Sequence, residues 1–193
     1  LTRVYRQQDE RFITILNHIR DGHPTPEDLS LLNRRCKPLF IPRPGDGYIR
    51  LTTHNRMADS YNENELRKLP GRSIGFTAEV KGEFPPQNYP AEERLTLKAG
   101  AQVMFIKNDP SGRHLYYNGR IGHITSISND GITVRCPGDN EDIKVEQQEW
   151  ENTRYVINPS TKVIEPQVQG VFRQYPLRLA WAITIHKSQG LTF

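Results

Sequence analysis

The stretch YIRLTTHNRMADSYNENELRKL, residues 48–69, decides the fold class, because it reads as a strand followed directly by a helix. Its first third is rich in β-branched and apolar residues, which favours a strand. Met57, Ala58 and Tyr61 then fall on one face of a helix. Asn55 is placed to cap this helix at its N-terminus. A strand that leads into a helix is the building unit of α/β domains, so we predict an α/β fold.

Two further helices are predicted upstream of this unit. Apolar residues recur at helical spacing between Asp9, which is placed as an N-cap, and Gly22, which is placed as a stop. A second, shorter helix follows, with Thr25 at its N-cap and Pro26 at its first helical position.

Downstream of the unit the sequence changes to short β stretches separated by Gly and Pro, over residues 73–171. SNDG at 128–131 and NPST at 158–161 are typical of hairpin turns. We expect a small barrel or curled sheet of five or so strands here. The sequence thus predicts a β domain inserted between residues 1–72 and 172–193, which together form a larger α/β domain.

Composition sets broad limits on the class of protein. Of 193 residues, 35% are hydrophobic and 25% charged, and no apolar stretch is long enough to span a bilayer. The N-terminus shows no secretion signal, so we expect an intracellular protein, which would be cytoplasmic and nucleoid-associated in a bacterium. Lys and Arg exceed Asp and Glu by 26 − 22 = 4, a mild basicity that is compatible with nucleic acid. Cys36 and Cys136 lie in no metal-binding pattern, so we expect two buried, reduced thiols and no metal site.

The final segment is unusually polar. We expect AWAITIHKSQ, residues 180–189, to be a helix that ends at Gly190. Thr184, Lys187 and Ser188 would then share one face of it. Hydroxyl and ammonium groups beside a glycine are suited to binding phosphate oxygens, whereas a solvated helix end is the alternative interpretation.

Three sequence motifs point to one family. AITIHKSQGLTF (182–193) resembles the fifth conserved motif of superfamily-one helicases of the RecD-like and Pif-type branch, and LTRVYRQQDERFITILNHIR (1–20) resembles their fourth. LTLKAGAQVMFIKND (95–109), with YYNGRIGHI after it, is similar to the Src-homology-three-like barrel inserted in this branch. The resemblance implies a partial RecA-like domain of the P-loop NTPase type, the second of two in such a helicase, with an inserted all-β barrel and a missing C-terminal end.

The resemblance also implies an activity and a set of site residues. The activity is that of an ATP-dependent DNA helicase that moves 5′ to 3′ along single-stranded DNA. Arg6 would be the arginine finger, and Gln7, Gln189 and Gly190 would lie near the nucleotide with it. The residues implied to contact DNA are Thr53, His54, Asn55, Thr184, His186, Lys187 and Ser188.

Two expected features of such a motor are missing from the chain. It contains neither a G-x-x-x-x-G-K-[ST] phosphate loop nor an acidic pair for magnesium. ATP and Mg²⁺ are therefore expected as cofactors of the full-length enzyme, held by an absent N-terminal RecA-like domain, and this chain alone should bind neither and be inactive. The expected partners are that domain and single-stranded DNA, with no membrane.

Two other functions stay open at this point. NGRIGHITSISNDGITV (118–134) also resembles the Gly-x-x-Gly hairpin of small RNA-binding barrels, which would make the chain a nucleic-acid-binding module without ATPase activity. The third possibility is a structural adaptor that docks on a partner protein.

Overall fold

The computed structural model describes residues 7, 9–43, 46–128, 131–157 and 162–189. The chain divides into two compact units, Leu1–Pro42 and Arg43–Phe193, which are described separately below. In the described part of the chain, no helix has the length and apolar character needed to cross a membrane.

The N-terminal unit contains both of the predicted upstream helices. Helix α1 spans Glu10–Arg20, and the carboxylate of Asp9 accepts a hydrogen bond from a backbone N–H in its first turn at 3.1 Å. Helix α2 spans Pro26–Asn33 and begins with a capping box between Thr25 and Asp28. Both predicted N-caps are confirmed, because capping depends on residues only three positions apart.

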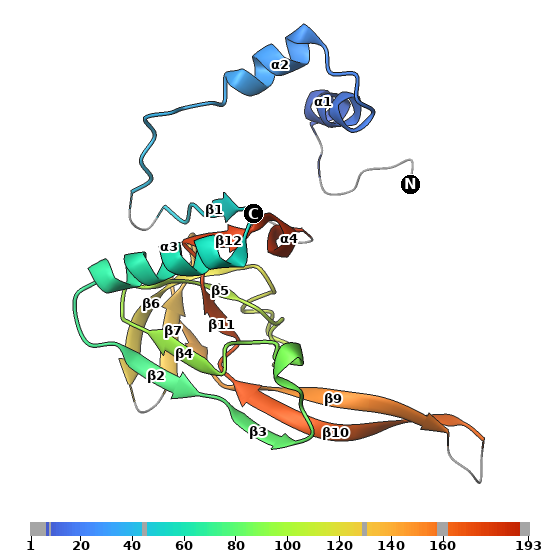
Figure 1. Cartoon of the computed structure of the whole chain (residues 1–193). Helices are drawn as coiled ribbons and strands as arrows, with labels where there is room; N and C mark the ends of the chain where they lie inside the picture. The colour runs from blue at the N-terminus through green and yellow to red at the C-terminus, as the bar shows by residue number, and fades with distance from the viewer. Residues whose placement is uncertain (1–6, 8, 44–45, 129–130, 158–161, 190–193) are drawn as a thin grey trace. The chain divides into compact units, whose positions relative to one another are not determined.

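The second unit is built around a parallel strand pair covered by a helix (Figure 1). Strand β1, Arg50–Thr52, pairs in parallel with β12, Ala182–Thr184. Helix α3, Asn55–Lys68, packs on both strands and buries Ala58 and Leu66. This arrangement confirms the predicted strand–helix unit and the α/β fold class.

The buried face of α3 differs from the predicted one. Met57 is exposed, whereas Ala58, Asn62 and Leu66 are buried at a spacing of four residues. The N-cap is His54, so that Asn55 is the first helical residue. The apolar pattern was misleading because one of the three buried positions of the helix, Asn62, carries an amide.

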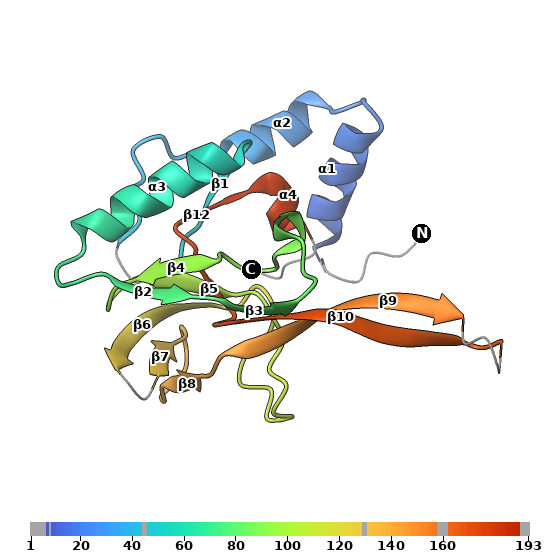
Figure 2. The same cartoon turned by 60° about the horizontal axis from the view of Figure 1, so that its bottom comes forward.

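Strands of the predicted β region, together with β11 beyond residue 171, form a five-stranded antiparallel sheet in the order β11-β5-β6-β7-β8 (Figures 1 and 2). The SNDG hairpin is confirmed by the pairing of Ser128 with Gly131, while Asn129 and Asp130 lie outside the described residues. The strand ladders among the described residues do not close this sheet into a barrel. Its strands are β5, Gln102–Phe105; β6, Ile121–Ser128; β7, Gly131–Arg135; β8, Ile143–Val145; and β11, Leu177–Leu179.

The sheet carries the main hydrophobic core. Its inward residues alternate along the strands, so that Val103, Phe105, Ile132 and Val134 are fully buried. Leu66 of α3 joins the same cluster. The helix that covers β1 and β12 is therefore anchored in the core of the β region.

Two smaller antiparallel sheets complete the unit. β2 (Ile74–Thr77) pairs with β4 (Arg94–Leu97), and β10 (Ile164–Gln174) lies between β3 (Glu79–Gly82) and β9 (Gln148–Ile157). A short 3-10 helix, η1, spans Pro86–Asn88. The outer halves of β9 and β10 form a two-stranded hairpin that extends away from the five-stranded sheet (Figures 1 and 2). Pro166 lies in this half, where β10 has a partner on one side, which suits a residue without an N–H.

The predicted helix over 180–189 is wrong. The chain forms strand β12 up to Thr184 and only then the short helix α4, Ile185–Ser188. All three residues of β12 are buried, as in a parallel strand covered on both faces, and sequence alone does not separate such a short buried strand from a buried helix.

The two cysteines differ in environment. Cys136 is buried in the main core as predicted, whereas Cys36 is exposed, so its predicted burial is wrong. Both are free thiols. The predicted boundaries of the inserted β domain, 73 and 171, stay a prediction.

Candidate nucleic-acid interface

Two of the segments predicted to contact DNA meet at one edge of the molecule. The parallel register places Thr52 opposite Thr184, so that the carboxyl ends of β1 and β12 lie side by side. Thr53, His54 and Asn55 follow β1, and α4 follows β12. Loops at the carboxyl ends of parallel strands are the usual ligand-binding positions of α/β sheets.

The turn between β1 and α3 is fixed by a buried hydroxyl. Thr52 Oγ1 donates to the His54 carbonyl oxygen at 3.2 Å, and Thr53 Oγ1 lies 2.8 Å from His54 Nδ1. Helix α3 then begins without a side-chain cap hydrogen bond and without an acidic residue in its first turn. The N-terminus of such a helix favours an anion, because its first backbone N–H groups and the helix dipole both present positive charge.

The segment after β12 presents polar groups of different exposure. Thr184 is buried at the strand end, whereas His186, Lys187 and Gln189 are exposed. Ser188 Oγ donates to the Ile185 carbonyl oxygen at 2.7 Å, which uses its hydrogen within the short helix. Thr184 and Lys187 do not share a helix face as predicted, but the strand–helix turn still places both beside the same pocket.

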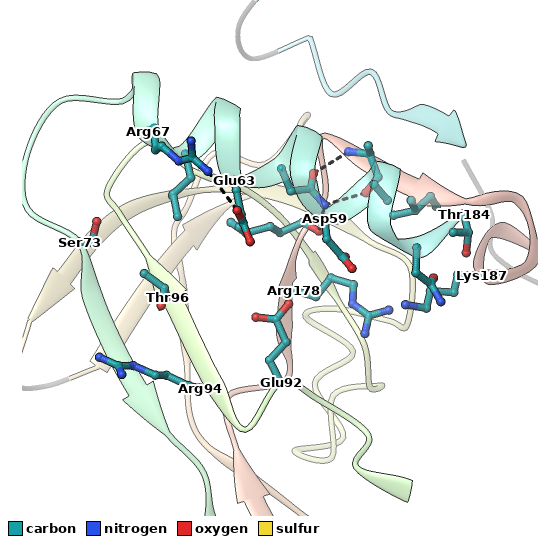
Figure 3. A pocket seen from close by; sticks show the side chains of 17 residues that line it. Asp59, Glu63, Arg67, Ser73, Glu92, Arg94, Thr96, Arg178, Thr184 and Lys187 are labelled. Carbon is teal, nitrogen blue, oxygen red and sulfur yellow. Dashed lines mark hydrogen bonds and ion pairs between the residues drawn. The ribbon is translucent and has the colours of Figure 1, made fainter. Parts of the chain in front are cut away.

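That pocket has a volume of about 630 Å³ and lies between α3, β11 and α4 (Figure 3). Asn55, Thr184 and Lys187 line it, together with charged residues that the sequence did not single out, among them Asp59, Glu92 and Arg178. Lys187 is an exposed residue, but its side chain lines the pocket and is partly shielded from water there. This partial desolvation, followed by the charge of Arg178, lowers the pKa of Lys187. Desolvation likewise raises the pKa of Glu92.

The residues predicted to contact the nucleotide are not brought together by the described structure. Gln7 belongs to the N-terminal unit, where its side-chain oxygen accepts a hydrogen bond from the Asp9 backbone N–H at 3.0 Å. Gln189 is exposed after α4. Arg6 and Gly190 lie outside the described residues.

Comparison with known proteins gives one consistent family. No family model matches the chain. The ATP-dependent DNA helicase Pif1 of Bdellovibrio bacteriovorus is 32% identical over the whole chain, which spans 42% of that protein, and human PIF1 is 33% identical, with 29% of its length spanned. Among solved structures, unliganded Pif1 from Bacteroides sp. matches 99% of the chain with a TM-score of 0.88 and 35% identity. A Pif1 helicase from Bacteroides in complex with ADP-AlF3 and single-stranded DNA matches all of it, with a TM-score of 0.68 and 38% identity. The chain spans 43% of each of these two solved chains.

The matches include the α/β segments at both ends as well as the β region between them. Similarity of this extent, in sequence and in structure, shows common descent with the C-terminal portion of these proteins. The chain is therefore related over its whole length to the C-terminal portion of the Pif1 helicases, and it spans less than half the length of the relatives it matches.

Proposed function

We propose that this chain is the C-terminal part of an ATP-dependent DNA helicase that translocates 5′ to 3′ on single-stranded DNA. The observation that carries the proposal is the parallel pairing of β1 with β12, which joins Thr53–Asn55 and Thr184–Ser188 at one edge. Relatives over the whole chain are named ATP-dependent DNA helicases, and one of them was solved with single-stranded DNA. Because these relatives match the α/β segments too, they support a helicase rather than an isolated small-barrel RNA-binding module or an adaptor.

The proposed DNA contacts are mainly to the backbone. The N-terminus of α3, the hydroxyl of Thr53 and the side chains of His54, His186 and Lys187 are donors suited to phosphate oxygens. None of these groups is arranged to read one particular base, so we expect weak sequence preference and strong salt dependence.

The proposed nucleotide contacts come from residues near the two ends of the chain. The N-terminal RecA-like domain would hold the ATP phosphates and Mg²⁺, and Arg6 would stabilise the charge that develops on the transferred phosphoryl group. Gln7, Gln189 and Gly190 would lie nearby. An arginine finger contributes roughly 10³ to 10⁵ in rate, and its planar fork is not reproduced by lysine.

The DNA contacts are tested with the double variant His186→Ala, Lys187→Ala in the full-length protein. Fluorescence anisotropy with a labelled oligonucleotide should show weaker binding, and a shallower dependence of log affinity on log salt by about 0.7 per lost phosphate contact. Lys144→Ala, on the exposed face of β8, removes the same formal charge away from this edge and should bind nearly as the wild type does. Unchanged affinity in the double variant would refute the proposed interface.

The role of Arg6 is tested separately. Arg6→Ala should abolish ATP turnover while single-stranded DNA binding stays close to that of the wild type, because the guanidinium is proposed to act on the γ-phosphate alone. Turnover at the wild-type rate would show that another residue is the arginine finger.

A further inference from the structure

Two cationic side chains from different elements approach each other in the pocket at the β1–β12 edge. Arg178 comes from β11 and Lys187 from α4, and Figure 3 shows the guanidinium of Arg178 directed towards the Lys187 side chain. Among the described residues, neither side chain forms a hydrogen bond or an ion pair within 4 Å. Two like charges held together without a contact partner are unfavourable, and an anion between them would relieve the repulsion.

The position of Arg178 is fixed by its strand. Leu177 and Leu179 are buried in the main core, so alternation along β11 turns Arg178 to the opposite face, and the Arg178 side chain lines the pocket. The backbone of Arg178 is paired with Met104 of β5. The guanidinium therefore reaches the pocket from a rigid sheet and needs no rearrangement of the backbone to bind a ligand.

The remaining groups at this end of the pocket suit a phosphate. Thr184, at the end of β12, supplies a hydroxyl, and Asn55 opens helix α3, whose N-terminus favours an anion. An arginine fork and a lysine ammonium are the two side chains that proteins use most for phosphate, the first by paired hydrogen bonds and the second as a point charge.

Two carboxylates face the same space. Asp59 and Glu92 line the pocket near Arg178 and Lys187, and none of these four groups is in contact with an oppositely charged partner (Figure 3). The four charges sum to zero, so a bound phosphate gains attraction from two of them and meets repulsion from the other two. A helicase must release the DNA backbone at every translocation step, so its affinity for each phosphate has to be limited.

We infer that Arg178 and Lys187 jointly bind one backbone phosphate of single-stranded DNA, and that Glu92 opposes this binding and thereby favours release. The inference rests on the proposed function and adds Arg178 and Glu92 to its binding site. It predicts opposite effects for two neutralising substitutions in one pocket, which a general loss of structure does not produce.

The test uses Arg178→Gln, Glu92→Gln and Lys187→Gln in the full-length protein, with anisotropy on a labelled oligothymidylate at several salt concentrations. Arg178→Gln should bind about tenfold more weakly, as expected for a lost charge-assisted hydrogen bond, with a salt slope shallower by about 0.7. Glu92→Gln should bind about threefold more tightly and release the oligonucleotide more slowly. The control is Arg94→Gln, which removes a cation from the far end of the same pocket and should change affinity by less than about twofold (Figure 3).

The outcomes separate this inference from the proposed function. If Lys187→Gln weakens binding while Arg178→Gln does not, the DNA interface stands and the two-cation site is wrong. If Glu92→Gln leaves affinity unchanged or lowers it, the opposing role of Glu92 is wrong. If neither Lys187→Gln nor Arg178→Gln has any effect, the proposed interface itself fails. Thermal melting of each variant shows whether the fold is retained.

Discussion

Asn62 bridges helix α3 to strand β12, and its removal should destabilise the second unit more than any other single polar change on this helix. The buried side chain donates to the Ala182 carbonyl oxygen at 2.9 Å and to the Leu179 carbonyl oxygen at 3.4 Å. Its amide oxygen accepts from the Ala182 N–H at 2.8 Å. Replacement of Asn62 by Ala removes all three hydrogen bonds at once.

The magnitude follows from the groups that would be left unpaired. Asn62→Ala strips the side-chain partner from both the N–H and the carbonyl oxygen of the buried residue Ala182, and each buried unsatisfied group costs about 1–3 kcal/mol. We expect a total loss of about 3 kcal/mol in the free energy of unfolding. For a unit of this size, each kcal/mol lowers the melting temperature by about 2–4 °C, so the loss corresponds to a shift of roughly 6–12 °C.

The assay is thermal unfolding followed by circular dichroism, with Asn64→Ala as the matched control. Asn64 lies on the exposed face of the same helix, where alanine has the higher helix propensity, so this variant should melt within about 2 °C of the wild type. If Asn62→Ala also melts within that interval, the bridge does not stabilise the unit, and the argument from unsatisfied backbone groups is refuted.

Three further predictions concern other parts of the chain. Gly170→Ala should destabilise the protein by about 2 kcal/mol, because a Cβ there would clash with the backbone that follows β3, whereas Gly75→Ala meets only ordinary contacts and should be neutral in thermal melting. A thiol reagent at pH 8 should modify exposed Cys36 quickly and Cys136 only after unfolding, because burial raises the pKa of Cys136 to about 11; fast reaction of both thiols would contradict this. Hydrogen bonds lower the pKa of Asp28 to about 2, and the largest contribution comes from the backbone N–H of Thr25, the N-cap of α2. The N-terminal unit should therefore keep this stabilisation above a pH of about 4 and lose it as the pH falls towards 2. A titration midpoint of Asp28 near 4, measured by NMR, would contradict this prediction.

The parts of the fold that were predicted correctly depend on neighbours in sequence. The N-caps of α1 and α2 need only a side chain three residues from its backbone partner, and the β6–β7 hairpin needs only the SNDG turn. The C-terminal helix was predicted wrongly because β12 is a strand only through its pairing with β1, which lies far earlier in the chain. A short apolar segment carries no local signal for such a partner.

Some residues of the candidate site can likewise be identified from neighbouring sequence, whereas others are brought to it only by the fold. The family motifs identify Thr184, His186 and Lys187, since these residues lie together in sequence. Arg178 and Glu92 stand outside the motifs and reach the pocket only because β11 and the loop before β4 approach α4 in the folded unit. Alternation between Leu177 and Leu179 indicates that Arg178 points away from the core, but not which element it faces.

Helix α3 connects the stability of this unit to its proposed DNA contacts. Strand β12 has three residues and α4 has four, and elements this short do not hold their own geometry. Their positions depend on pairing with β1 and on the hydrogen bonds of Asn62 to Ala182, two residues before Thr184. The same helix presents its N-terminus to the pocket. A change that loosens α3 from β12 therefore displaces both the helix N-terminus and Lys187, so it should weaken DNA binding together with stability, whereas a clash at Gly170 in the β3–β10 pair should lower stability and leave the DNA contacts of the folded protein intact.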